Sequence, residues 1–120
     1  ETDVLNVLNR YDIDPDRPII GQVARFDPWK NPLGAIDVYK KVKEKFSDLQ
    51  LVMIGVFAHD DPEASEWYKK TIDYAQKLND RDIHILTNYD GIGDIEVNAF
   101  QRAFTIALHL THIQQLHLRM

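Results

Sequence analysis

The hydrophobic and polar positions of this chain follow two alternating patterns. Short uncharged runs rich in β-branched residues are typical of strands covered on both faces, and they lie at residues 19–24, 49–54 and 83–86. Apolar residues spaced three and four apart predict amphipathic helices, which lie at residues 3–10, 31–46, 61–78 and 94–104. The pattern therefore predicts strands and helices in alternation.

Two of the predicted helices begin with a capping residue followed by proline. Asn31 precedes Pro32 and Asp61 precedes Pro62, and proline is well tolerated at a first helical position. In the helix after Asn31, the predicted inward stripe is Leu33, Ile36, Tyr39, Val42 and Phe46. The lysines of that helix are predicted to face solvent: Lys40, Lys41, Lys43 and Lys45.

Strands and helices that alternate in units of about 30 residues are typical of βαβ crossovers. The predicted fold class is therefore α/β, with a Rossmann-like parallel sheet and flanking helices. We divide the chain into a leading helix and linker (1–17), a Rossmann-like domain (18–104) and a divergent apolar tail (105–120). Ligands of such sheets bind at the carboxyl ends of the strands, so the candidate loops are 25–30, 55–61 and 87–94.

Charge and composition narrow the class of protein. The chain has 19 acidic and 14 basic residues among 120, for a net charge of −5, which disfavours a nucleic-acid-binding module. There is no cysteine, no apolar run of membrane-spanning length and no signal-peptide pattern. We therefore expect a cytoplasmic protein without a membrane or nucleic-acid partner. All the acidic residues precede Val97, so the end of the chain differs in composition.

The loop after the first predicted strand carries the most informative charges. Arg25 and Lys30 are the only cations between Arg17 and Lys40. Beside a helix N-terminus, a guanidinium and an ammonium together suit a diphosphate. The alternative is that both are ordinary surface cations paired with Asp27 or Asp37. Glycine-rich phosphate loops do not occur in the sequence, so phosphate contact rests on side chains.

Residues 18–34, with the string Arg-Phe-Asp-Pro-Trp-Lys at 25–30, resemble the donor-binding domain of retaining glycosyltransferases of family 4. The similarity is greatest to the subgroup that forms trehalose, and it continues through residues 52–63, 85–88 and 96–103. The resemblance implies half of a two-domain GT-B enzyme. It also implies transfer of glucose, with retention, from a nucleotide-activated donor of the UDP- or ADP-glucose type to free glucose.

The resemblance also assigns roles to particular residues. It implies that Arg25 and Lys30 are catalytic, because they hold the donor diphosphate and stabilise the leaving nucleotide. It places Gly55 where a ligand approaches the backbone, and Leu86, Thr87 and Asn88 near the nucleotide base, where backbone groups make most contacts. No tightly bound cofactor is implied, and a Mg²⁺ requirement is left open.

The chain departs from the family where the family has an acidic pair, Glu, seven residues, Glu. Gln114 occupies the first of these positions, and the second lies past Met120. The resemblance therefore implies a partial donor domain, and we expect the isolated chain to be inactive. The alternative function is a non-enzymatic α/β module that binds nucleotide phosphates or another protein. An exposed sheet edge would favour homo-oligomers.

Two groups of residues are candidate metal sites. His59, Asp60, Asp61 and Glu63 include the carboxylates that Mg²⁺ prefers, although a helix cap explains Asp61 and Glu63 at least as well. The second group, His109, His112 and His117, matches no standard metal-site spacing. We favour a partly buried segment with these histidines at its margin.

Overall fold

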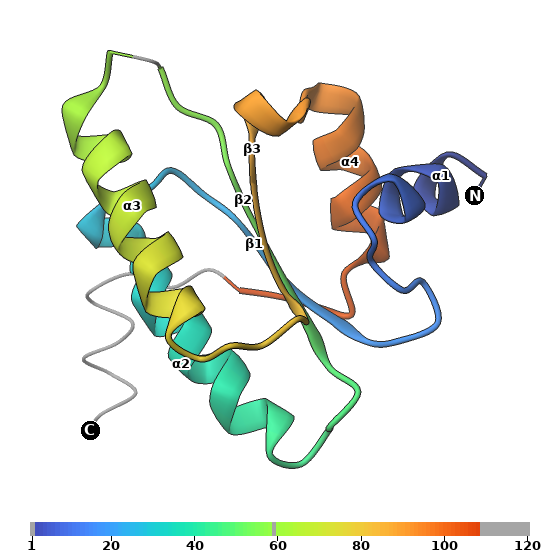
Figure 1. Ribbon diagram of the computed structural model, residues 1–120. Helices are drawn as coiled ribbons and strands as arrows, with labels where there is room; N and C mark the ends of the chain where they lie inside the picture. The colour runs from blue at the N-terminus through green and yellow to red at the C-terminus, as the bar shows by residue number, and fades with distance from the viewer. Residues whose placement is uncertain (1, 59, 109–120) are drawn as a thin grey trace.

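Each uncharged run of the sequence forms a strand, and each amphipathic stretch forms a helix beside the sheet (Figure 1). The structure, a computed structural model, describes residues 2–58 and 60–108. Its elements in chain order are α1 (Thr2–Arg10), β1 (Ile19–Val23), η1 (Pro28–Lys30), α2 (Pro32–Lys43), β2 (Gln50–Gly55), α3 (Pro62–Gln76), β3 (Ile83–Thr87), η2 (Asn88–Asp90), α4 (Asp94–Ala103) and β4 (Ile106–Ala107). The predicted α/β class is confirmed.

The described strands form one parallel sheet in the order β3-β2-β1-β4. Helices α2 and α3 cover one face, and α1 and α4 cover the other (Figure 1). The first three strands are added toward one side of the sheet. After β3, helix α4 crosses the opposite face and leads to β4 on the other side of β1, so the strand order reverses between β1 and β4. In open α/β sheets, such a switch point is where ligands bind.

The sheet separates two apolar clusters. Along β2, alternate residues face opposite sides: Leu51 and Met53 pack with α2, whereas Val52 and Ile54 pack with α1 and α4. All four side chains are fully buried. Burial on both faces is the physical reason why β2 contains no charged residue.

The helix caps follow the predicted pairs. Asn31 Oδ1 accepts the Gly34 N–H at 3.1 Å, and Asp61 Oδ1 accepts the Ala64 N–H at 3.1 Å. Asn31 has a positive φ of 51° and also ends η1. Both predicted N-caps are confirmed.

Several details differ from the sequence prediction. Helix α2 ends at Lys43, so Phe46 lies beyond it and is 57% exposed rather than buried. Lys43 is half-buried in an ionic network rather than solvent-facing. Segments predicted as loops contain the short helices η1 and η2, and the segment assigned to the tail supplies β4, which pairs with β1 through Ile20 and Gly21.

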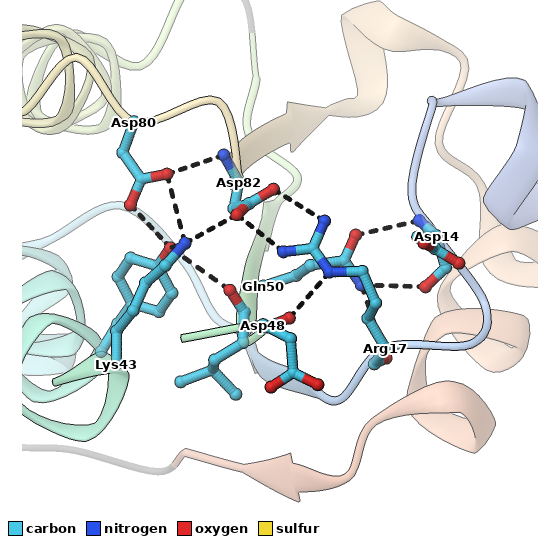
Figure 2. Close-up of polar contacts among 9 residues, drawn as sticks. Asp14, Arg17, Lys43, Asp48, Gln50, Asp80 and Asp82 are labelled. Carbon is cyan, nitrogen blue, oxygen red and sulfur yellow. Dashed lines mark hydrogen bonds and ion pairs between the residues drawn. The ribbon is translucent and has the colours of Figure 1, made fainter. Parts of the chain in front are cut away.

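An ionic network joins the amino-terminal ends of the strands (Figure 2). The Arg17 guanidinium, just before β1, donates to both carboxylate oxygens of Asp82, just before β3, at 3.1 and 2.7 Å. Lys43 Nζ, at the end of α2, lies 2.7 Å from Asp82 and 3.4 Å from Asp80. The Tyr39 hydroxyl donates to Asp80 at 2.7 Å and accepts from Lys43 at 2.7 Å. The network therefore connects α2 with the starts of β1 and β3.

The network changes the acidity of its carboxylates. The hydrogen bonds from Arg17, reinforced by Lys43 and opposed by partial burial, lower the pKa of Asp82 from 3.8 to about 2. Burial alone would raise the pKa of Asp80. The hydrogen bonds from Tyr39 and the Asp82 backbone, together with Lys43, outweigh burial, so the pKa of Asp80 is lowered from its ordinary value of 3.8. Both carboxylates are therefore charged at neutral pH.

Replacing Asp82 tests the contribution of this network to stability. A carboxylate with a lowered pKa stabilises the fold at pH values above its unfolded pKa, and the contribution is lost as the pH falls toward its folded pKa. We expect Asp82→Asn to lower the free energy of unfolding by about 2 kcal/mol at pH 7 and by clearly less at pH 2.5. Urea titrations at both pH values measure this, with Asp73→Asn on the exposed face of α3 as control. Equal losses at the two pH values would contradict the assignment.

A close approach at the centre of the sheet gives a second prediction. A Cβ on Gly21 of β1 would lie 2.1 Å from the Phe104 ring at the end of α4. We expect Gly21→Ala to cost about 1 to 3 kcal/mol through overpacking, and the added change Phe104→Leu to recover part of that loss. Thermal unfolding measures both. Gly93→Ala is the control, because a Cβ there meets only the Glu96 carboxylate at 3.3 Å.

Candidate functional site

The parallel register brings the carboxyl ends of three strands to the same edge of the sheet. Val23 is opposite Ile54, and Gly55 is opposite Thr87. The Ala24 N–H also donates to the Ile54 carbonyl at 2.9 Å, which extends the pairing toward the first loop. The candidate loops after β1, β2 and β3 therefore start side by side.

Arg25 lies two residues beyond β1, at this edge. Its side chain is 69% exposed, and its Nη2 is 3.8 Å from Asp61 Oδ2 at the start of α3. The guanidinium is therefore accessible to a ligand, while a carboxylate from the neighbouring loop lies within ion-pair distance.

Lys30 is exposed at the end of η1, and its backbone is held on both sides. Its N–H donates to Asp27 Oδ1 at 3.0 Å, and its carbonyl accepts from the buried Gln22 amide at 3.1 Å. Asn31 then turns the chain into α2. These bonds determine where the flexible lysine side chain begins.

The two carboxylates considered as surface partners of these cations have other donors. Asp27 caps η1 through the Lys30 backbone N–H, and Asp37 accepts a short hydrogen bond from the Tyr74 hydroxyl. The recorded ion pair of Arg25 is with Asp61. The roles of Arg25 and Lys30 toward a ligand stay predictions.

Gly55, at the end of β2, has a packing reason to be glycine. A Cβ there would lie 2.2 Å from the ring of Phe26, which is 2% exposed. The space beside this backbone is therefore filled by Phe26. Ligand contact at Gly55 stays a prediction.

The residues expected near the nucleotide base make internal contacts. Leu86 packs against the apolar cluster beneath α1 and α4, and the buried Thr87 caps η2 by accepting the Tyr89 N–H at 3.1 Å. The Asn88 amide accepts the Phe57 N–H at 3.1 Å and donates to the Phe57 carbonyl at 3.3 Å. Asn88 thus joins the loops after β2 and β3, and base recognition here stays a prediction.

An aromatic cluster connects all three loops, and sequence reasoning missed it. Phe57 is its centre, with ring centroids 5.9 Å from Phe26, 5.6 Å from Tyr68 and 5.5 Å from Tyr89. Phe26 follows β1, Phe57 follows β2 and Tyr89 follows β3. An aromatic residue shortly after each of these strands was the signal that could have revealed it. The contacts hold the loops in a common arrangement.

No group of three or more metal-ligating side chains suited to a metal ion occurs among residues 2–58 and 60–108. Over the same residues, no helix is long and apolar enough to span a membrane. His59, the three histidines of residues 109–117 and Gln114 lie outside the part of the chain that the structure describes.

Comparison with known proteins agrees with the fold. The family profile described as "Glycosyl transferases group 1" matches residues 6–110. Proteins named trehalose synthase from Thermococcus litoralis and Pyrococcus furiosus are each 52% identical over 112 residues, which is 92% of this chain and 26% of each relative. The trehalose synthase of Rubrobacter xylanophilus is 48% identical over 99 residues, or 82% of this chain and 23% of the relative.

The chain thus spans about a quarter of the length of these relatives. Because the family profile covers most of the chain and the parallel α/β sheet agrees with it, the chain belongs to the group 1 family of glycosyltransferases.

Proposed function

We propose that these residues bind the donor of a retaining glucosyltransferase that moves glucose from a nucleotide-activated donor to free glucose, forming trehalose. The observation that carries the proposal is the loop after β1. It sets the exposed cations Arg25 and Lys30 at the carboxyl edge of β1, beside the switch point between β1 and β4. The trehalose synthase names of the relatives support the choice of reaction.

In this proposal the two cations act on the donor diphosphate. Negative charge grows on the leaving nucleotide diphosphate as its bond to the sugar breaks, so fixed positive groups there lower the barrier. Arg25 offers a planar pair of donors for two phosphate oxygens, and Lys30 offers a compact charge. The bonds of the Lys30 backbone to Asp27 and Gln22 fix the point from which its side chain extends.

The remaining ligand contacts are proposed at the same carboxyl ends of the strands. In the proposal, backbone groups of Leu86, Thr87 and Asn88 contact the base, because the side chains of Thr87 and Asn88 already form hydrogen bonds within the protein. The nucleotide, whether UDP or ADP, and any role of Mg²⁺ are further parts of the proposal. Association of copies through an exposed sheet edge is a separate expectation, which light scattering measures.

Calorimetric titration with UDP tests the diphosphate role. We expect Arg25→Ala and Lys30→Ala each to weaken UDP binding about 10-fold, because each removes a charge-assisted hydrogen bond of about 1.5 kcal/mol or more. Lys41→Ala, on the exposed side of α2, is the matched control and should bind like the parent. Unchanged affinity in both loop variants would refute the proposal.

A transfer assay tests whether these 120 residues alone catalyse glucosyl transfer. With UDP- or ADP-glucose and glucose, we expect no trehalose, because Gln114 stands where the family has the first glutamate of its acidic pair. The product is measured by chromatography, with the full-length relative from Pyrococcus furiosus as the positive control. Trehalose formation by the chain alone would contradict this expectation.

A further inference from the structure

We propose that Asp61 competes with the donor diphosphate for Arg25, so that the residue capping α3 sets the affinity of the site for its anion. The inference rests on the function proposed above, because it requires Arg25 to bind phosphate. Its basis is the 3.8 Å approach of Arg25 Nη2 to Asp61 Oδ2, which joins the loop after β1 to the loop after β2.

The side chains of Arg25 and Asp61 differ in conformational freedom. One oxygen of Asp61 accepts the Ala64 N–H at 3.1 Å, and the Asp61 N–H donates to the Ala58 carbonyl at 3.1 Å. The Asp61 carboxylate is 30% exposed, whereas the Arg25 side chain is 69% exposed on a long flexible stem. The carboxylate is therefore a stationary acceptor, and the guanidinium is the part that moves.

The strength of the pair suits displacement by a ligand. An exposed ion pair at this distance is weak, whereas a guanidinium bound to phosphate in two-pronged geometry forms stronger charge-assisted bonds. A diphosphate can therefore draw Arg25 away from Asp61. The same carboxylate repels the arriving anion, so both effects of Asp61 weaken diphosphate binding.

The pair has a role for the empty site as well. Without Asp61, the Arg25 side chain would sample many rotamers in solvent. With Asp61, it spends part of its time directed toward the loop after β2, next to the start of α3. An anion of sufficient charge then replaces the carboxylate as the partner of Arg25.

Asp61→Asn separates the charge of this residue from its capping role. Asparagine caps helices about as well as aspartate, so the Ala64 N–H keeps its acceptor and α3 keeps its start. The neighbouring carboxylate Asp60 is exposed and provides a matched control through Asp60→Asn. Circular-dichroism melting shows whether both variants fold like the parent.

Calorimetry with UDP as the probe, at 0.15 M salt, tests the inference in a double-mutant cycle. We expect Asp61→Asn to tighten UDP binding 3- to 5-fold and Asp60→Asn to change it less than 1.5-fold, because the ion pair of Arg25 is with Asp61 and an exposed charge outside the pair is screened. In the Arg25→Ala background, the gain from Asp61→Asn should fall below 1.5-fold. A full gain in that background would show general repulsion alone and overturn the inference.

The outcomes distinguish this inference from the proposed function. If Arg25→Ala weakens binding while Asp61→Asn leaves it unchanged or weaker, the competition is refuted and the diphosphate role stands. If Arg25→Ala binds like the parent, the proposed function fails and the inference fails with it. The Nε–Hε resonance of Arg25 gives a second readout: Asp61→Asn should shift it in the free protein but not in the UDP complex. A shift of equal size in both states would overturn the competition.

Discussion

The arrangement of the candidate site depends on the alignment of parallel strands, and the network at their amino-terminal ends is the interaction that holds this alignment. Arg17 connects the start of β1 to that of β3 through Asp82, and Lys43 connects the end of α2 to the same carboxylate. The buried Gln50 amide accepts the Asp14 N–H and donates to the Asp14 carbonyl, which adds the start of β2. Because the strands are short, alignment at one end determines which residues lie together at the other.

The two edges of the sheet use their charges differently. At the amino-terminal edge, cations and carboxylates form short, partly buried contacts with one another, as Figure 2 shows. At the carboxyl edge, Arg25 is largely exposed and its contact with Asp61 is long. Charges at the first edge stabilise the fold, whereas those at the second are available to a ligand. This difference supports binding at the carboxyl edge, where a parallel sheet places its loops.

The sequence predicted those parts of the fold that depend on local pattern. Uncharged runs identified the strands β1, β2 and β3, and the Asn-Pro and Asp-Pro pairs identified the starts of α2 and α3, because burial and capping act within a few residues. The position of Arg25 and Lys30 at a strand end was predictable for the same reason. Phe46 was assigned to the core because its spacing continued the stripe, but α2 ends three residues before it.

Contacts between distant segments could not be predicted in this way. Arg17 and Asp82 are 65 residues apart, and the bonds between Asn88 and Phe57 span 31 residues, so no local pattern indicates either. The filling of the space beside Gly55 by Phe26 depends on how two loops fold together. At the site, therefore, the sequence identified the exposed cations, whereas the structure was needed to find the side chains that position the loops around them.

Hydrogen–deuterium exchange with and without UDP is the most direct test of where the ligand binds. We predict slower exchange of backbone amides in residues 24–31 and 55–58, with unchanged exchange in residues 14–17 and 80–83 at the opposite edge. Protection confined to the amino-terminal edge, or no protection at either edge at saturating UDP, would contradict a donor site at the carboxyl ends of the strands.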